Sequence, residues 1–458
     1  MFLNTPPIIR EKLNLKWAII DVKKELLSLF QIAVLGLMIF APLCGAQPYV
    51  GSDGRGYIHF WSWRPPVYPI FIWLFHGFGE YQFVVTMWVQ SFLVFVALLY
   101  ARFWLHTYLN LSQFVTFLIL SFTIIVDFLS SHILQWMYAE SIAFFLFIFT
   151  FLLFVDNLKT FNSKKLIFMV IAGNLLILTR GQFICFYLLF LLIPILQFWN
   201  KKPKKQAIFT FLTIMISIVF FMLVDKSYHY FLHGQFRGIS YVGRDLIVQP
   251  LYLADSTSAR YFTDPDEKST FIKLINKLEK RHLTRNTAPS PVMAKYSRIS
   301  YDYFTNNYNL IDELFSQDIY PPEIADSDYQ SDDLMFNIAK TLILNEPKAN
   351  LTLYVWKITS YFATPWIFFA FLITLIAIVF RVLIDRDWQP SMKQLFIIAS
   401  FLFILVNAII VAIFQTYSPR YFYYTYFLFF CLSGLLANEF LQYRSAIKLE
   451  AMPESVKS

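Results

Sequence analysis

Long apolar runs dominate this chain. Residues 81–100, 139–156 and 394–415 are examples, and each is close in length to the helix of about 20 residues that crosses the hydrocarbon core of a bilayer. Of all residues, 57% are hydrophobic and only 15% are charged, a balance that excludes most classes of soluble protein. A backbone in lipid must satisfy its own hydrogen bonds, so we expect an all-α polytopic membrane protein.

The apolar runs predict about ten spans. Their approximate bounds are 26–46, 81–100, 112–130, 139–156, 165–179, 182–199, 206–224, 353–380, 394–415 and 420–438. The fifth and sixth runs are short and are separated only by "TRGQ". They are therefore either two full spans or a re-entrant pair.

The lysines and arginines predict the orientation. If the N-terminus is cytoplasmic, the short inside segments hold 19 Lys and Arg residues and the short outside segments hold 4, Arg55, Arg64, Arg180 and Arg420. Cytoplasmic loops carry the positive excess in membrane proteins. We therefore expect a protein of the cytoplasmic (inner) membrane with both termini in the cytoplasm. The basic residues do not cluster on one soluble face, so no nucleic-acid partner is expected.

This orientation divides the chain into five parts. We expect a cytoplasmic amphipathic segment, a transmembrane core of about seven spans, an extracytoplasmic segment, C-terminal spans and a cytoplasmic tail, at residues 1–25, 26–224, 225–352, 353–438 and 439–458 respectively. Patches such as "STFIKLINKLEKRHL" indicate that the extracytoplasmic segment is mainly helical.

Charged residues gather on the predicted outer face. The four outside arginines share that face with Asp53, Asp127, His132 and Glu140, and ionisable residues at the membrane edge are candidates for a functional site. Each also has a purely structural explanation. Asp53 suits a helix cap, Glu140 suits the dipole at a helix start, and arginines pack on aromatic rings or extend to the interface. The gathering itself favours a binding site.

The chemistry of this face favours a lipid-linked substrate. The inside loops contain no glycine-rich phosphate loop, so a nucleotide-activated donor is not expected. A donor carried on a membrane lipid fits better. Its phosphate matches guanidinium groups, which form two parallel hydrogen bonds and stay charged at the bilayer edge.

Four stretches carry a family resemblance. They are "GSDGRGYIHFWSWRPPVYP", "YAESIAFFLF", "LLILTRGQFICFYLLFLL" and "SPRYFYYTYFLF". In this order the chain resembles the GT-C superfamily of integral-membrane glycosyltransferases, which includes the protein mannosyltransferases and the aminoarabinose transferase of lipid A. The resemblance covers residues 30–225 and 353–438 in layout.

The resemblance implies an activity and a site. It implies transfer of a sugar, with inversion, from a polyprenyl-phosphate-linked donor to a hydroxyl of an extracytoplasmic acceptor: a glycan, a lipid-linked oligosaccharide or another cell-envelope polymer. The implied catalytic residues are Asp53, as general base, and Glu140. The lipid phosphate would be bound by Arg64, Arg180, Arg420 and Arg55. The substrates would be contacted by Tyr57, His59, Trp61, Trp63, Tyr68, His132 and Tyr421.

The first outer loop, residues 47–80, is the implied catalytic loop, with interfacial helices. Many members of the superfamily carry two acids there, whereas "SDGRGY" has only Asp53, so a bound divalent metal is disfavoured and no cofactor is expected. Gly54 and Gly56 are expected to let the loop turn tightly. Pro65 and Pro66 are expected to end any helix before the next segment.

Two other functions stay open at this level. An O-antigen-type polymerase or ligase also has many spans and a large outer segment with arginines. A transporter of lipid-linked glycans would also bind lipid phosphate, although transporters often show paired halves and none is visible here. The sequence predicts neither the sugar, the acceptor nor the oligomeric state.

Overall fold

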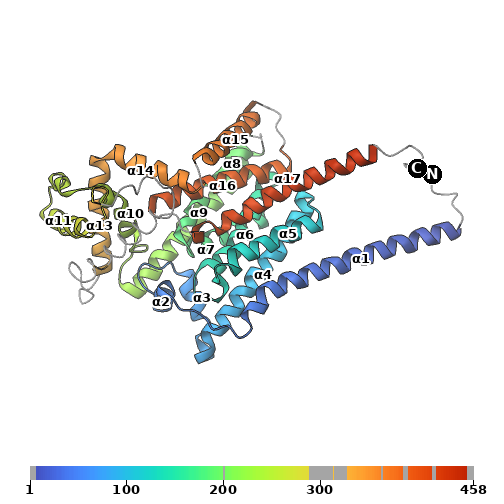
Figure 1. Ribbon diagram of the computed structural model, residues 1–458, viewed down its shortest axis with the longest axis horizontal. Coiled ribbons are helices and arrows are strands. Elements are labelled where there is room, and N and C mark those ends of the chain that lie inside the picture. Colours follow the sequence, from blue (N-terminus) through green and yellow to red (C-terminus); the bar gives the residue numbers. More distant parts are fainter. Residues whose placement is uncertain are drawn as a thin grey trace.

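The structure is a computed structural model that describes residues 7–199, 202–287, 313, 327–362, 365–384, 390–414 and 419–450. The regular elements in these ranges are all helices, and a single β-bridge joins Tyr49 to Trp136. A bundle of long helices carries a smaller helical lobe at one end (Figure 1). The predicted all-α class is confirmed.

Apolar helices of different lengths form the bundle. They are α1 (Pro7–Phe40), α4 (Gln82–Leu109), α5 (Gln113–Thr123), α6 (Glu140–Lys159), α7 (Ser163–Ile177), α8 (Cys185–Trp199), α9 (Lys204–His233), α15 (Pro365–Ile384), α16 (Met392–Phe414) and α17 (Tyr423–Glu450). α6 is the central helix: it packs against α4, α7, α8 and α16 and is buried over most of its length. Its phenylalanine-rich sequence therefore fills the interior on all sides, as expected of a helix that is hydrophobic all round.

Seven stretches of the described helices are long and apolar enough to cross a membrane. They are Glu25–Leu43, His76–Leu109, Glu140–Lys159, Gly181–Trp199, Lys204–His233, Met392–Phe414 and Tyr423–Arg444. A membrane protein is thus supported, with seven candidate spans among the described residues where ten were expected. The expected span 165–179 is the 15-residue helix α7. The expected span 353–380 is divided between α14 and α15.

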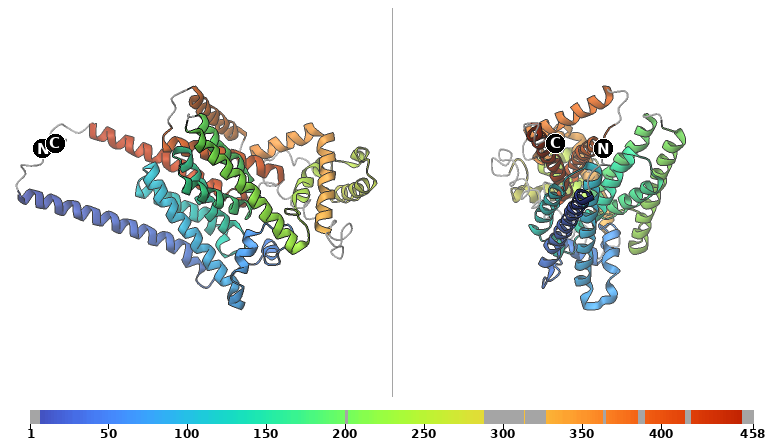
Figure 2. Two further views of the ribbon diagram at one scale, coloured as in Figure 1. Left: turned by 180° about the vertical axis from the view of Figure 1, so that it is seen from behind. Right: turned by 90° about the vertical axis from the view of Figure 1, so that its right-hand side faces the viewer.

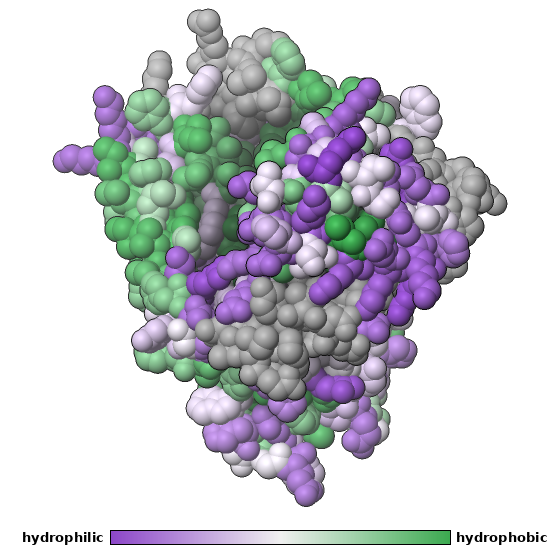
Figure 3. Space-filling view, turned by 90° about the vertical axis from the view of Figure 1, so that its left-hand side faces the viewer, coloured by the Kyte–Doolittle hydropathy of each residue, from purple (hydrophilic) through white to green (hydrophobic). Residues whose placement is uncertain are grey.

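The lobe follows α9, which continues past its expected end at residue 224 to His233. We use "the lobe" for α10 (Val242–Leu253), the 3-10 helix η6 (Ser256–Tyr261), α11 (Pro265–Lys280), α13 (Ser327–Asn345) and α14 (Pro347–Ser360). It has its own hydrophobic core, which includes Ile247, Leu251, Phe271, Leu274, Met335 and Ile338. Burial of each such side chain contributes about 1.5–3 kcal/mol. Hydrophilic side chains gather over the lobe, whereas the bundle beside it is largely hydrophobic (Figure 3).

The two ends of the molecule differ. α1 and α17 both project from the end of the bundle that lies opposite the lobe, in the views of Figures 1 and 2. The N-terminal end of α1 and the C-terminal end of α17 therefore lie on one side, and the lobe lies on the other. This arrangement is compatible with the predicted orientation.

The segment 47–80 lies at the end of the bundle that carries the lobe, on the side where α2 and α3 are labelled (Figure 1). It forms α2 (Ser52–Ile58), α3 (Val67–Trp73) and the 3-10 helix η2 (His76–Tyr81). The prediction of a tight turn at Gly54 and Gly56 is wrong, because both glycines lie inside the helix α2. Their lack of a side chain lets neighbouring residues pack closely against this helix. A Cβ at Gly54 would lie 3.2 Å from the carbonyl oxygen of Met137, and one at Gly56 would lie 2.8 Å from Nε of Arg64.

Candidate functional site

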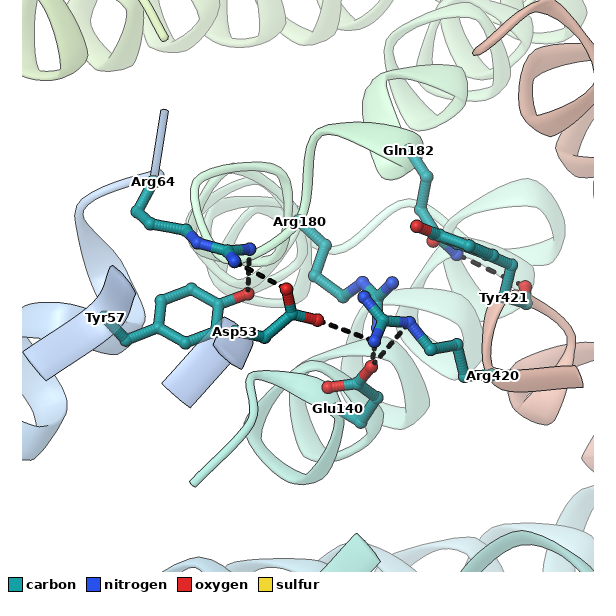
Figure 4. A network of polar contacts seen from close by, with 8 residues as sticks. All are labelled: Asp53, Tyr57, Arg64, Glu140, Arg180, Gln182, Arg420 and Tyr421. Atoms are coloured by element: carbon teal, nitrogen blue, oxygen red, sulfur yellow. Dashed lines mark hydrogen bonds and ion pairs between the residues drawn. The ribbon is translucent and has the colours of Figure 1, made fainter. Parts of the chain in front are cut away.

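Asp53 lies between two arginines. Its Oδ1 is 2.6 Å from Nη2 of Arg64 and its Oδ2 is 2.6 Å from Nη1 of Arg420 (Figure 4). Burial raises the pKa of Asp53, but the guanidinium groups of Arg420 and Arg64 outweigh burial and hold that pKa well below its usual range. Asp53 is therefore a carboxylate near neutral pH. The N-cap of α2 is Gly51, so Asp53 does not cap this helix.

Glu140 is the second carboxylate. It is the first residue of α6, and its side chain is only 4% exposed. Its Oε1 lies 2.6 Å from Nη1 of Arg180 and 3.5 Å from Nε of Arg420. Arg420 therefore contacts both carboxylates. We call the five residues Arg64, Asp53, Arg420, Glu140 and Arg180, in this order of contact, the charged chain.

Four separate segments supply the charged chain. Asp53 and Arg64 come from the 47–80 segment, and Glu140 comes from the start of α6. Arg180 stands between α7 and α8, in extended backbone before the 3-10 helix η5 (Gly181–Ile184). Arg420 belongs to the 3-10 helix η8 (Pro419–Tyr421), before α17. All of them lie at helix ends or short links, where a side chain can extend across the end of the bundle.

Positive charge exceeds negative charge in the charged chain. Three guanidinium groups and two carboxylates leave one formal positive charge, since 3 − 2 = 1. Arg180 is only 8% exposed, and an arginine keeps its charge even when buried. An uncompensated charge at a buried site favours a ligand of opposite sign. An anionic group would therefore compensate the excess charge of the charged chain.

Aromatic rings line the arginines. The guanidinium carbon of Arg64 lies 4.5 Å from the ring centroid of Tyr57, and Nη1 of Arg64 donates a hydrogen bond to the Tyr57 hydroxyl at 3.5 Å. The ring of Tyr421 lies 4.9 Å from Arg180 and 5.4 Å from Arg420. Such cation–π contacts hold a guanidinium in place without neutralising it.

Tyr68 supports the site by packing against Tyr57. It is fully buried, and its hydroxyl donates a hydrogen bond to Oε1 of Gln90 at 3.0 Å. The rings of Tyr68 and Tyr57 pack edge to face, with their centroids 4.9 Å apart. The amide nitrogen of Gln90 donates to the carbonyl oxygens of Leu134 and Trp136. Tyr68 is therefore a packing partner of Tyr57 rather than a surface for substrate.

The remaining predicted residues lie around the charged chain. Arg55 is exposed, and its side chain makes no hydrogen bond or ion pair within the described ranges. His59 is exposed and stacks on Trp61, which is 37% exposed. Trp63 contacts Tyr241, beside the lobe, at 5.7 Å between ring centroids. His132 is exposed, with a backbone φ of 55°. The structure thus brings Arg64, Arg180 and Arg420 to the carboxylates and leaves Arg55 outside.

Several polar residues of the site were missed by the sequence reasoning. Gln182 and Asn407 donate to the carbonyl oxygen of Tyr421 at 3.4 and 3.3 Å, and so support the segment that carries Arg420. Tyr138 places its ring 5.7 Å from Arg420. Burial raises the pKa of Tyr138 to about 12, so its phenol stays neutral. The signal for Gln90 and Asn407 was present: each is an amide inside a long apolar run.

Asp127 lies apart from the charged chain. It is fully buried in a π-helical turn, Ile124–Leu129, and neither carboxylate oxygen has a hydrogen-bond partner among the described residues. A buried polar group without a partner is costly.

The donor set of the charged chain does not fit a divalent metal. Both oxygens of Asp53 contact guanidinium groups, and arginines repel a second cation at that position. In the part of the chain that the structure describes, no group of three or more His, Cys, Asp or Glu side chains is arranged to hold a metal ion.

Comparisons of the chain with protein-family models, curated proteins and solved structures found no match.

Proposed function

We propose that this chain is a membrane glycosyltransferase of GT-C type. It transfers a sugar from a polyprenyl-phosphate donor to a hydroxyl of an acceptor on the extracytoplasmic side, with inversion. The observation that carries this proposal is the charged chain, in which three arginines surround two carboxylates at one end of an apolar bundle.

The charge of the donor matches the site. A phosphodiester between a lipid and a sugar carries one negative charge, and the charged chain has one formal positive charge in excess. Arg180 and Arg420 are the better candidates to bind the phosphate. Both pack on the ring of Tyr421, and they share Glu140, which holds them side by side. A guanidinium presents several donors to phosphate oxygens in a fixed geometry.

The chemical step needs a base and a stabilised leaving group. The acceptor oxygen attacks the anomeric carbon while its proton passes to a carboxylate oxygen of Asp53. The bond between the anomeric carbon and the phosphate oxygen breaks, and its electron pair stays on the phosphate, where the arginines stabilise the added charge. One displacement of this kind inverts the anomeric configuration. A positioned base contributes about 10²- to 10⁴-fold to the rate.

Asp53 is a weak base while both of its oxygens contact arginines. Its lowered pKa reflects these two contacts. When the donor phosphate draws Arg420 toward itself, one oxygen of Asp53 loses its partner and becomes more basic. On this proposal, donor binding activates the base. Proton transfer then occurs only when both substrates are present.

The proposal is tested with purified protein in detergent. The protein is incubated with a panel of polyprenyl-phosphate sugars and an extract of cell-envelope acceptors, and release of polyprenyl phosphate is measured together with the labelled product. We expect wild type to consume one donor and Asp53→Asn to lose transfer by about 10²-fold or more. Asp333→Asn is the matched control, since Asp333, in α13 of the lobe, forms an exposed ion pair with Arg237, in the segment between α9 and α10.

Three outcomes would count against the proposal. Undiminished transfer by Asp53→Asn would remove Asp53 from the mechanism. A product that grows by repeat units would favour a polymerase. A requirement for sealed vesicles, with no bond made or broken, would favour a transporter.

A further inference from the structure

Ser62, Trp63 and Arg64 are consecutive residues of the 47–80 segment, and they contact two different parts of the molecule. Arg64 belongs to the charged chain. The two residues before it, Ser62 and Trp63, contact the lobe and the segment that leads into it. The hydroxyl of Ser62 donates to Oδ2 of Asp328 at 2.6 Å, and the hydroxyl of Ser240 donates to the Ser62 hydroxyl at 2.8 Å. Both serines are almost fully buried.

Trp63 makes the second contact with the lobe. The guanidinium carbon of Arg244, in α10, lies 4.8 Å from a ring centroid of Trp63. Nη2 of Arg244 also lies 3.7 Å from Oδ1 of Asp328, at the start of α13. Asp328 therefore contacts both Ser62 and the arginine that covers Trp63. We call Ser62, Trp63, Ser240, Arg244 and Asp328 the junction.

The lobe side of the junction is firmly built. Oδ1 of Asp332 accepts hydrogen bonds from the backbone nitrogens of Gly243 and Arg244, at 2.8 and 3.1 Å. α10 and α13 pack so closely that a Cβ at Gly243 would lie 2.0 Å from the carbonyl oxygen of Asp332. Arg244 and Asp328 are thus presented by two helices that are fixed to each other.

We infer that the lobe positions Arg64 for its contact with Asp53 through the junction, with Asp328 and Arg244 as positioning residues. The backbone between Ser62 and Arg64 is too short for either end to move alone. Release of Ser62 and Trp63 would therefore let Arg64 leave the 2.6 Å contact with Asp53. The effect on catalysis rests on the proposed function, whereas the effect on the loop does not.

The first test needs no substrate. Ser240→Cys is introduced as a reporter, because Ser240 is 1% exposed and lies in the junction. The exposed Cys44 is replaced by serine, while Cys185 and Cys431 are buried. The rate at which a membrane-impermeant maleimide labels the introduced thiol then measures how often the junction opens. We expect Asp328→Ala to speed labelling by about tenfold, because a hydrogen bond to a charged group is lost.

Two further variants sharpen this test. Asp328→Asn can still accept the Ser62 hydrogen bond, so its labelling should stay closer to that of the parent. Asp333→Ala, five residues along the same helix, breaks only the exposed pair with Arg237 and should leave labelling unchanged. Equal labelling in Asp328→Ala and its parent would overturn the inference. Equally fast labelling in Asp333→Ala would also overturn it, because the effect would then be general loosening of α13.

The second test measures transfer. If the lobe positions Arg64, Asp328→Ala should lower kcat by about tenfold with little change in KM for the acceptor, because the base and phosphate contacts lose alignment. Asp328→Asn should recover most of the loss. A rise in KM alone would overturn the positioning role. If wild type itself transfers no sugar, the proposed function fails, and the labelling result alone decides whether the junction holds the loop.

Discussion

The guanidinium of Arg420 contacts the carboxylate of Asp53 at 2.6 Å, although Arg420 lies between α16 and α17 and Asp53 precedes α4. The same guanidinium contacts Glu140 at 3.5 Å. One side chain thus joins two carboxylates that come from different elements. This relationship makes Arg420 the most informative position for mutation.

Arg420→Ala should abolish most transfer without loss of expression. The variant removes the link between the two carboxylates and the proposed contact to the leaving phosphate, so we expect a decrease in kcat of about 10²- to 10³-fold. Arg55→Ala is the control, since Arg55 is an exposed arginine outside the charged chain. It should leave the rate almost unchanged, because the Arg55 side chain contacts neither carboxylate of the charged chain within the described residues. A large loss in Arg55→Ala would show that the phosphate site extends to α2.

Asp53 should stabilise the fold in a pH-dependent way. Its pKa is lower in the folded protein than in the unfolded chain. The stabilisation is therefore present above the unfolded pKa and is lost as pH falls toward the folded one. Asp53→Asn should lose about 2 kcal/mol, the order of a charged hydrogen bond. The Tm difference from wild type, measured in detergent, should be constant from about pH 8 to 5 and shrink below about pH 4. A difference that grows in acid would contradict the ion pairs.

Gly243→Ala should destabilise the lobe. The added Cβ would lie 2.0 Å from the backbone oxygen of Asp332 and 2.7 Å from the backbone nitrogen of Phe336, and neither atom can move without its helix. Overpacking of this kind costs about 1–3 kcal/mol. Hydrogen exchange should increase in α10 and α13. Gly181→Ala is the control, because nothing lies within 4 Å of its added Cβ, and its exchange should match wild type.

Asp127 and Glu140 should respond in opposite ways to an apolar replacement. Asp127→Leu removes a fully buried carboxyl that lacks a partner in the described structure, and should raise the free energy of unfolding by about 1–3 kcal/mol. Glu140→Leu leaves Arg180 buried without the carboxylate that lies 2.6 Å from it, and should lower the free energy of unfolding. Thermal unfolding of both variants in detergent checks the signs. A lower Tm in Asp127→Leu would show that Asp127 has a partner in the working protein.

The apolar pattern of the sequence predicted the long helices of the bundle well, but it predicted poorly where helices end or are interrupted. Helices α4, α6, α9 and α16 are long enough that composition alone identifies them. The division of the expected span 353–380 into α14 and α15 depends on packing against α16 and the lobe, which periodicity does not report. Similarly, α9 continues past residue 224 through polar sequence to His233, and hydropathy alone does not report where such a helix ends.

The candidate site was predictable in its charges but not in its connections. Arg64, Arg180 and Arg420 were notable because a cation outside the positive-inside pattern needs a cause. Which arginine meets which acid depends on how the helix ends converge, and no local signal encodes that. The junction could not be predicted either. Ser62 and Asp328 are polar residues far apart in the sequence, with no motif around them, and they become partners only when the lobe folds.

Synthesis order gives the charged chain a further consequence. A ribosome delivers Asp53 and Arg64 first, then Glu140, then Arg180, and Arg420 last of the five. Until that last segment is inserted, Asp53 lacks its 2.6 Å contact from Arg420, and Glu140 has only Arg180. The charged chain therefore closes only when the segment that carries Arg420, before α17, takes its place. A protein truncated before Arg420 would leave Asp53 paired with Arg64 alone and Glu140 paired with Arg180 alone.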